Sequence, residues 1–409
     1  MKALVFERRP ARYAAAMAAG RVAPGSGAKV GPLRLRDHDV PELPGPSWRY
    51  VKPRLAGICG SDLSTIDGTS SRYFEPIVSF PFVLGHEVVG DLVDPDRPDD
   101  EPDGSNRVVI EPVLGCVTRN ISPVCDPCAR GDLGSCERIA FGELAPGLQT
   151  GFCCDTGGGW STVMTAHESQ LHAVPADMSD EAAVMVEPTA CAVHGALAGG
   201  DVAGETVVVL GAGTLGLLTV AALRRFADPG CLIAVAKHPE QRRLARELGA
   251  DVVAAPGEVK RAVRRVTGTL AIGDGPITRL TGGAAVTYDC VGSEASVTES
   301  LAVVRPRGRV VLLGMAGRTR LDLTGLWQRE LQLVGAYTYG TEHLADGRSP
   351  RTFDLAFELV AAADLGRLVS ATYPLARYAD AVTHAAEAGT RGGVKIAFDL
   401  RQEKERRRA

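Results

Sequence analysis

Residues that bind metals lie in the first half of the chain. Cys59 stands in an Ile-Cys-Gly-Ser-Asp segment, and a Gly-His-Glu triplet places His86 and Glu87 shortly after it. A further acid, Glu187, lies in a Val-Glu-Pro segment. A thiolate, an imidazole and a carboxylate form a mixed ligand set that zinc accepts in catalysis, with one position left open. These residues therefore predict a catalytic metal site.

Each of these residues also has an ordinary structural explanation. Cys59 could fill a small buried position, His86 could be a hydrogen-bonded core histidine, and Glu187 could begin a helix. The run after His86 is Glu-Val-Val-Gly, so it lacks the second histidine of a metalloprotease motif.

A second group of thiols lies further along. Four of the ten cysteines fall close together with spacing C-x8-C-x2-C-x7-C, namely Cys116, Cys125, Cys128 and Cys136. Four thiolates close a tetrahedral shell and leave no position for chemistry, so the spacing predicts a structural zinc. The alternative is four free loop cysteines, which would be an oxidation liability.

A glycine-rich turn indicates a dinucleotide site. The turn reads Gly211-Ala-Gly213-Thr214-Leu215-Gly216; it follows a predicted strand at 206–210 and opens a predicted helix at 215–226. Phosphate binds at such a helix N-terminus because the backbone N–H groups point at it. A glycine-rich turn without a ligand is the alternative.

The end of the next predicted strand, 232–235, bears on the choice of cofactor. NAD-binding enzymes usually place an acid there to hold the ribose 2′-hydroxyl. The segment from Cys231 to Pro239 contains no acid and is followed by basic groups: Lys237, His238 and Arg242. These groups would attract a 2′-phosphate, so the sequence predicts NADP(H) in preference to NAD(H). A solvated basic helix start that tolerates NAD is the alternative.

Bulk properties restrict the class of protein. A length of 409 residues allows two domains, and 45% hydrophobic with 23% charged residues is typical of a globular protein. The net charge of −4 predicts neither a nucleic-acid nor a membrane partner. Residues 206–223 carry no charge but contain three glycines, so they read as a strand and a helix. The N-terminus lacks a signal-peptide pattern, and we expect a cytoplasmic protein.

The order of these motifs resembles the zinc-dependent medium-chain dehydrogenase/reductase family, which includes alcohol and polyol dehydrogenases. The resemblance extends from about Met1 to Leu400 and includes Glu111-Pro112 ahead of the cysteine cluster. It implies an α/β fold with two domains. A mostly-β GroES-like catalytic domain would comprise 1–192 and 341–409, with the structural zinc lobe at about 111–140. A Rossmann domain with a doubly wound parallel sheet would comprise 193–340.

The resemblance also implies roles at the metal. Cys59 and His86 match two zinc ligands, and Glu187 matches the third. Glu87 matches a residue that binds zinc directly in some family members and lies just behind it in others.

A proton relay is implied in the same way. Ser61 matches the hydroxyl that hydrogen-bonds the substrate oxygen, although it could instead cap a helix beginning near Asp62. Asp62 matches the acid that orients the zinc-bound histidine, and Lys395 falls where relatives carry a basic partner for that acid. Many relatives have a histidine where this chain has Ser64, so the outer part of the relay differs.

The sequence therefore predicts a zinc enzyme with one catalytic and one structural zinc that transfers hydride between NADP(H) and an alcohol or ketone, with a polyol or sugar-like secondary alcohol favoured. The alternatives are a zinc-free quinone or enoyl reductase of the same superfamily and a catalytically silent NADP-binding scaffold protein. Family members usually form dimers or tetramers, so we expect a homo-oligomer. Two insertions, 14–31 and 271–283, carry no obvious catalytic group.

Overall fold

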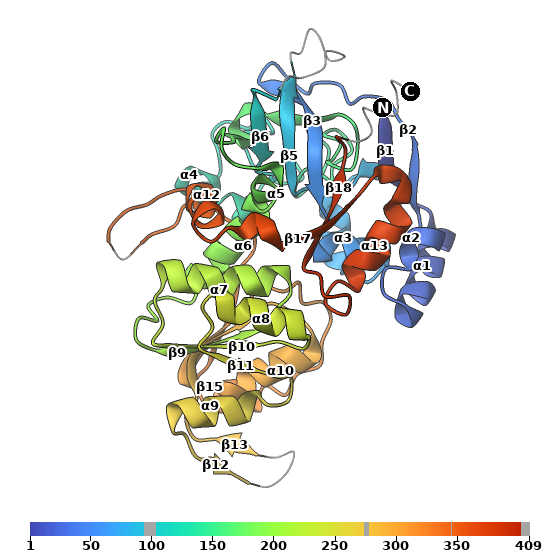
Figure 1. The fold of residues 1–409 in the computed structure, drawn as a ribbon. Helices are drawn as coiled ribbons and strands as arrows, with labels where there is room; N and C mark the ends of the chain where they lie inside the picture. The colour runs from blue at the N-terminus through green and yellow to red at the C-terminus, as the bar shows by residue number, and fades with distance from the viewer. Residues whose placement is uncertain (94–103, 274–277, 345, 402–409) are drawn as a thin grey trace. The chain divides into compact units, whose positions relative to one another are not determined.

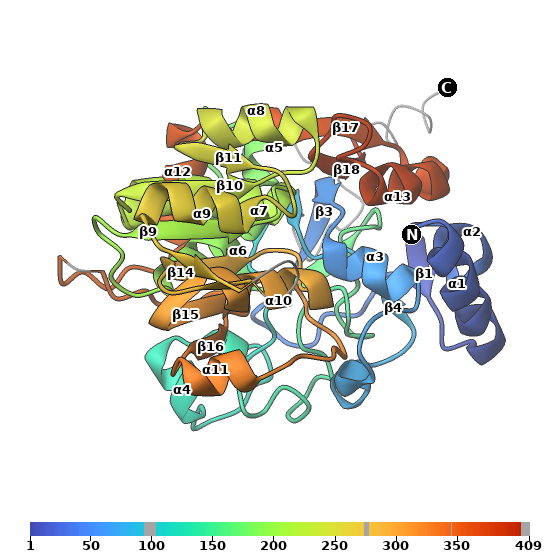
Figure 2. The same ribbon diagram turned by 90° about the horizontal axis from the view of Figure 1, so that it is seen from below.

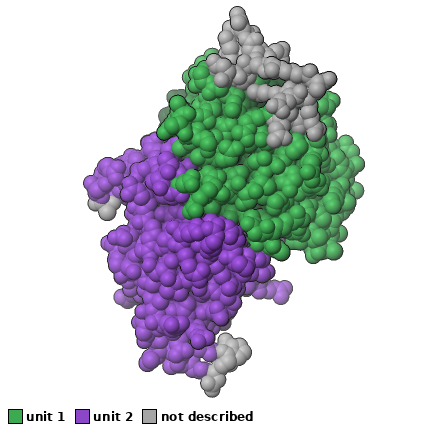
Figure 3. Space-filling model, in the orientation of Figure 1, with its two compact units in different colours: residues 1–187, 364–409 green, residues 188–363 purple. Residues whose placement is uncertain are grey.

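The computed structural model describes residues 1–93, 104–273, 278–344 and 346–401. The chain forms two compact units, shown in Figure 3: Met1–Glu187 with Asp364–Ala409, and Pro188–Ala363. The first division, at 187/188, lies close to the boundary at 192/193 that the sequence suggested, whereas the second, at 363/364, lies 23 residues after the suggested 340/341. Which ligands each unit binds stays a prediction.

The first unit is built mainly from strands. A seven-stranded sheet has the order β17-β18-β3-β5-β6-β8, with β7 also paired to β3. All its pairs are antiparallel except β17 with β18. Its strands are β3 (Trp48–Gly57), β5 (Val88–Val93), β6 (Arg107–Ile110), β7 (Met164–His167), β8 (Leu171–Ala173), β17 (Val369–Tyr373) and β18 (Lys395–Asp399). A smaller antiparallel sheet contains β2 (Leu33–Asp37), β1 (Lys2–Phe6) and β4 (Phe82–Val83), in that order.

Short helices cover this unit. They are α1 (Pro10–Val22), α2 (Gly27–Val30), α3 (Gly60–Ile66), α4 (Asp126–Arg130), α5 (Asp180–Ala183) and α13 (Tyr378–Ala386), with single 3-10 turns η1 (Arg72–Ile77), η2 (Leu133–Ser135), η3 (Glu168–Gln170), η5 (Leu365–Leu368) and η6 (Leu375–Arg377). The core beneath them is aromatic and aliphatic; Trp160 and Phe398 meet edge to face with ring centroids 4.9 Å apart.

The N-terminal insertion forms α1 and α2, and Figures 1 and 2 both show these helices beside α13. Asp67, at the C-terminal end of α3, holds the insertion in place. Its buried carboxylate accepts hydrogen bonds from the N–H of Gly25 (2.7 Å) and of Gly27 (3.0 Å). A Cβ on Gly27 would lie 2.4 Å from the carbonyl oxygen of Ile66, so the close approach requires glycine. The insertion is therefore packed on the helix that follows Cys59.

The second unit contains a six-stranded parallel sheet of order β11-β10-β9-β14-β15-β16. Its strands are β9 (Thr206–Leu210), β10 (Cys231–Val235), β11 (Val252–Ala254), β14 (Ala284–Asp289), β15 (Val304–Leu312) and β16 (Gln332–Gly335). Its helices are α6 (Val186–Leu197, which begins two residues before the unit), α7 (Thr214–Phe226), α8 (Pro239–Glu247), α9 (Val259–Thr267), α10 (Glu294–Val303), α11 (Thr324–Gln328) and α12 (Thr352–Ala362).

This sheet is the predicted doubly wound one. In Figure 1, α7 and α8 lie on one face of the sheet and α9 and α10 on the other. Strands β9 and β10 are continuous apolar runs because helices cover both faces. The strand order reverses between β9 and β14, which is where such sheets bind ligands. The uncharged stretch 206–223 is β9 and most of α7, as predicted, and no helix among the described residues is long and apolar enough to span a membrane.

The second insertion is a small antiparallel pair, β12 (Ala271–Ile272) with β13 (Arg279–Leu280). Residues 274–277, which belong to the predicted insertion, lie outside the described residues. The pair follows α9 and precedes β14, so it lies after the third strand and helix of the unit.

Candidate active site and zinc sites

Cys59, His86 and Glu87 come together at one end of the seven-stranded sheet. Their ligand atoms all lie within 4.8 Å of one another. Cys59 follows β3 in extended conformation, while His86 and Glu87 immediately precede β5. Because β3 and β5 pair antiparallel, with Ala56 opposite Val88, the end of one strand meets the start of the other. The N–H of Gly57 also donates to the carbonyl of Glu87 (2.8 Å).

Two glycines make room for this cluster. A Cβ on Gly57 would lie 2.0 Å from Oε2 of Glu87 and 2.8 Å from Cε of Lys395. Gly85 has φ of +101°, and a Cβ there would lie 2.4 Å from the indole of Trp160. Neither position accepts a larger residue without movement of the backbone or of a buried side chain.

Asp62 lies beside His86, as expected for the acid that orients it. Oδ1 of Asp62 is 3.5 Å from Nδ1 of His86, and both atoms are buried without a hydrogen bond to any described residue. The other oxygen of Asp62 accepts the N–H of Cys59 (2.9 Å). Burial lowers the pKa of His86, but the carboxylate of Asp62 raises it, and the net pKa is well above 6.5. A half-buried thiol, a buried imidazole and a buried carboxylate whose ligand atoms lie this close together fit a zinc ion.

Lys395 forms a buried ion pair with Glu87. Each side chain is only 2% exposed, and Nζ of Lys395 also donates to the carbonyl of Ile58 (3.2 Å). The sequence assigned Lys395 to Asp62, which was wrong. Lys395 begins β18, whose pairing with β3 (Ala397 opposite Gly57) places it beside Glu87. Burial lowers the pKa of Lys395, but Glu87, Cys59 and Glu187 together raise it by more, so the lysine stays charged.

Glu187 lies in the first turn of α6 and is buried. It is not among the three side chains whose ligand atoms lie within 4.8 Å of one another. Its carboxylate is close enough to raise the pKa of Lys395. Its role as the third zinc ligand stays a prediction.

Ser61 is the second residue of α3 and is half-buried. The residue that caps this helix is Cys59, so the alternative in which Ser61 caps a helix near Asp62 is wrong. The hydroxyl of Ser61 is therefore not needed for capping. Ser64 lies in the same helix, and its carbonyl accepts the N–H of Thr69 (2.8 Å).

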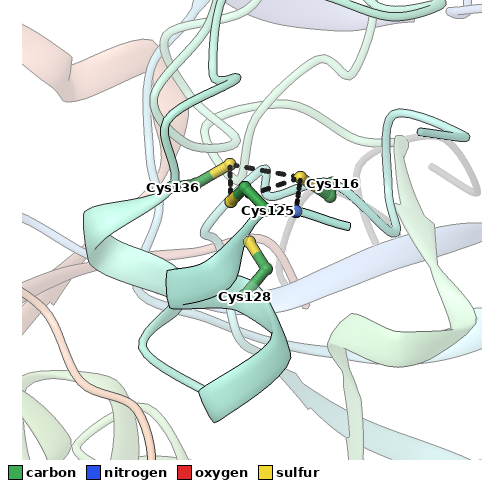
Figure 4. Close-up of side chains that lie close together, drawn as sticks. All are labelled: Cys116, Cys125, Cys128 and Cys136. Carbon is green, nitrogen blue, oxygen red and sulfur yellow. Dashed lines mark hydrogen bonds between the residues drawn. The ribbon is translucent and has the colours of Figure 1, made fainter. Parts of the chain in front are cut away.

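The four clustered cysteines converge in a separate lobe, drawn in Figure 4. The sulfur of Cys116 lies 3.6 Å from that of Cys125 and 3.7 Å from that of Cys136. A tetrahedral zinc with Zn–S bonds of ~2.3 Å requires sulfurs ~3.8 Å apart, so the cluster fits the ion. Burial raises the pKa of the Cys125 thiol, but N–H donors from Cys128 and Glu137 lower it to about 7. This thiol can therefore ionise near neutral pH.

Arg119 holds the lobe together, a role that the sequence analysis missed. Its guanidinium is fully buried and donates to backbone carbonyls of Leu114 (3.0 Å), Leu144 (3.0 Å) and Gly147 (2.7 Å). These carbonyls lie on both sides of the cysteine run. A single arginine between two cysteines has no distinctive spacing, so only its position three residues after Cys116 could have suggested this function.

In the second unit, the glycine turn connects β9 to α7. Gly211 has φ of +89°, and a Cβ on Gly216 would lie only 1.7 Å from the carbonyl oxygen of Gly211. Gly213 is the N-cap of α7, and a Cβ there would meet no atom within 4 Å. Thr214 and Leu215 open the helix. The first and third glycines are thus required by packing, whereas the second leaves open space at the helix N-terminus, as phosphate binding needs.

The basic residues after β10 differ in how they are held. Lys237 is exposed and His238 caps α8. Arg242 folds back, and its guanidinium donates to the carbonyls of Ala236 (3.0 Å) and Lys237 (3.3 Å). Arg242 therefore shapes the end of β10, and Lys237 is the more available charge.

Comparison with known proteins places the chain in a family. The family model "Alcohol dehydrogenase GroES-like domain" matches residues 45–176, and "Zinc-binding dehydrogenase" matches 214–362. "Probable D-xylulose reductase A" of Aspergillus clavatus is 30% identical over 312 residues, 76% of this chain and 80% of that protein. The chain belongs to the zinc-dependent medium-chain alcohol and polyol dehydrogenase family. This dehydrogenase is an oxidoreductase that acts on CH–OH groups by hydride transfer, as predicted.

Other relatives support this family assignment. L-idonate 5-dehydrogenase of Vitis vinifera is 26% identical over 376 residues, 90% of this chain and 92% of its own. A zinc-binding dehydrogenase structure from Sinorhizobium meliloti 1021, bound to NADP, has a TM-score of 0.68 at 25% identity and covers 97% of this chain and 98% of its own. The predicted α/β fold class, GroES-like plus Rossmann, is confirmed, and the dehydrogenase uses zinc and a nicotinamide cofactor.

Proposed function

We propose that the dehydrogenase interconverts a secondary alcohol of a polyol or sugar with its ketone, using NADP(H). The observation that carries the proposal is the convergence of Cys59, His86 and Glu87 within 4.8 Å. Relatives named D-xylulose reductase, L-idonate 5-dehydrogenase and sorbitol dehydrogenase support the substrate class. A substrate with adjacent hydroxyl groups fits a site rich in carboxylates.

Cys59, His86 and Glu187 would hold the catalytic zinc. When bound there, zinc polarises a carbonyl or lowers the pKa of an alcohol towards neutrality. Asp62 fixes the orientation of the His86 ring. Lys395 holds one oxygen of Glu87, which keeps that carboxylate beside the ligands, where it could also bind the ion.

Ser61 would exchange the substrate proton. Its hydroxyl is half-buried at the start of α3 and is free of the capping role, so it can both accept and donate. Ser64 is a candidate for the next step outwards, in place of the histidine of many relatives.

The basic end of β10 supports NADP(H) over NAD(H). Exposed Lys237, with His238 and Arg242 nearby, would pair with a 2′-phosphate, and no acid in 231–239 would repel it. Lys237→Glu should therefore reverse the preference, with a change of about 10–100-fold for NADP(H), as one charge-assisted hydrogen bond supplies. Arg246→Glu, at an exposed position near the end of α8, is the control and should leave the ratio within about threefold.

The four-cysteine lobe would hold the second, structural zinc, so we expect two zinc ions per chain. We also propose a homodimer or tetramer. Strand β16 is the last strand of its sheet, and Trp327 and Leu333 near it are exposed. A cytoplasmic location stays a prediction. Sedimentation at several concentrations tests the assembly.

Metal analysis combined with kinetics tests the mechanism. Freshly purified protein should contain two zinc ions per chain and oxidise polyols with NADP. Cys59→Ala should lose one zinc and nearly all turnover, whereas Cys231→Ala, a matched change in β10, should lose neither. One zinc per chain with undiminished turnover in Cys59→Ala would instead support a zinc-free reductase. No turnover with any alcohol or ketone, despite two zinc ions, would support a scaffold.

A further inference from the structure

A groove of about 260 Å³ lies outside the catalytic centre, beside the N-terminal insertion. Its lining is mostly basic and consists of Glu7, Arg9, Arg12, Pro32, Arg34 and Arg36. Four arginines and one glutamate give a net charge of +3, although the whole chain carries −4. The volume is below that of pockets for drug-sized ligands, so the groove suits a small anion or a phosphorylated metabolite.

The sheet positions these charges together. In the β1–β2 pair, Arg34 lies opposite Val5 and Arg36 lies opposite Ala3. Residues directly opposite share a face, so both arginines lie on the face of Ala3 and Val5, and Glu7 continues that alternation. Like charges placed two residues apart on one face repel each other unless an anion lies between them.

Glu7 balances only part of this charge. It forms ion pairs with Arg9 and Arg36. Burial raises the pKa of the Glu7 carboxyl, but these two arginines lower it by more, so the net change is downward. Among the residues that the structure describes, no carboxylate lies within ion-pair distance of Arg12 or Arg34. In addition, Nε of Arg36 is buried without a hydrogen-bond acceptor in that part of the chain.

Arg9 and Arg12, which line the groove, lie at the N-terminus of α1. Arg9 is the N-cap residue and makes no capping hydrogen bond, and the first turn contains no acid. Arg12 lies in that turn, where a cation is unfavourable next to the positive end of the helix dipole. A bound oxyanion would relieve this repulsion and accept hydrogen bonds from the guanidinium groups.

We infer that this groove binds a phosphoryl group, either as inorganic phosphate or as part of a phosphorylated metabolite. The planar guanidinium forks of Arg12 and Arg34 would bind its oxygens in pairs. The groove shares no residue with the zinc sites or the dinucleotide turn, so the inference does not depend on the proposed reaction.

Isothermal titration of the zinc-loaded, full-length protein tests the site. Sodium phosphate and glucose 6-phosphate are the two probes, with glucose as the uncharged control, at a fixed ionic strength of about 0.1 M, where the Debye length is ~10 Å. Arg12→Ala/Arg34→Ala should weaken phosphate binding about tenfold or more. Arg21→Ala removes an exposed arginine from the same helix, α1, and should have no effect.

The glycine turn at 211–216 is unchanged in all these variants. A difference in phosphate affinity between them therefore reports on the groove. Glu7→Gln removes the competing carboxylate and should tighten binding about threefold or more, which gives a second test if the double variant folds poorly. Equal affinity for both probes assigns recognition to the phosphoryl group alone, and tighter binding of glucose 6-phosphate adds a contribution from the sugar. Binding that is unchanged in both variants, or weakened equally by Arg21→Ala, overturns the inference.

Discussion

The buried pair Lys395–Glu87 offers the sharpest test of how the candidate active site is built. Both side chains are 2% exposed, and the pair lies next to Cys59 and His86. Lys395→Met keeps the length and apolar character of the side chain but leaves Glu87 without its cation. Removal of one partner of a buried pair costs about 3–5 kcal/mol because the remaining charge is not compensated. We therefore expect a loss of about this size in the free energy of unfolding of the first unit.

Removal of both charges should cost less. Glu87→Gln with Lys395→Met leaves two neutral side chains in the same space, and the loss should be about 0–2 kcal/mol. The double variant should thus be more stable than Lys395→Met alone. Lys29→Met, at an exposed position of α2, is the control and should change stability by less than ~0.5 kcal/mol.

Urea unfolding followed by tryptophan fluorescence measures these differences. Trp48 and Trp160 are buried in the first unit, whereas Trp327, in the second, is 77% exposed. In a Trp327→Phe background the signal comes from the first unit only, which avoids a mixed transition. The zinc content of every variant must be matched. A loss below ~1 kcal/mol for Lys395→Met, or a double variant less stable than it, would refute the reasoning.

Three further predictions concern the same unit. Asp180 accepts hydrogen bonds from three arginines, and these lower its pKa from 3.8 in spite of burial. Asp180→Asn should cost about 2–3 kcal/mol at pH 7. The Asp180 carboxylate has a lower pKa in the folded state than in the unfolded state. Its contribution to stability is therefore complete above the unfolded-state pKa and is lost as the pH falls through the folded-state pKa. The difference should therefore shrink below pH ~4 in acid-unfolding curves. Asp67→Asn should speed hydrogen exchange in residues 10–31, measured by mass spectrometry, because it weakens the hydrogen bonds that the Asp67 carboxylate accepts from the N–H groups of Gly25 and Gly27. Cys128→Ser should remove one zinc per chain in elemental analysis, whereas Cys231→Ser should remove none.

Each of these has a contrary outcome. A constant difference between Asp180→Asn and the parent protein from pH 7 to pH 3 would show that the carboxylate charge contributes little. Unchanged exchange in 10–31 would mean that apolar contacts alone anchor the insertion. Two zinc ions in Cys128→Ser would rule out the four-thiolate site.

Local motifs could be predicted because short-range chemistry determines them. The turn at 211–216 needs glycine at Gly211, where φ is positive, and at Gly216, where a Cβ would lie 1.7 Å from the Gly211 carbonyl oxygen, so its residues reveal the structure. The four cysteines of the lobe lie close together in the sequence, so their spacing predicted that the sulfurs would converge. The strands β9 and β10 were likewise visible as uncharged β-branched runs bounded by turns.

Contacts between distant segments could not be predicted in this way. Glu87 and Lys395 are 308 positions apart, and Asp180 meets Arg54 and Arg401 across 126 and 221 positions. Two buried acids, Asp62 and Glu87, were possible partners for Lys395, and nothing in its own segment distinguishes them. The pairing of β18 with β3 decided the choice.

The sequence by itself thus determined which groups are available for zinc, phosphate and hydride chemistry, because residue type and short spacing specify ligands and turns. Only the tertiary structure decided which charges neutralise which, since strand register and packing bring them together. It also showed that the N-terminal insertion, which carries no catalytic motif, packs on helix α3, and that the segments on either side of it line a basic groove. Charge pairing and groove formation are properties of the packed surfaces, which local sequence does not encode.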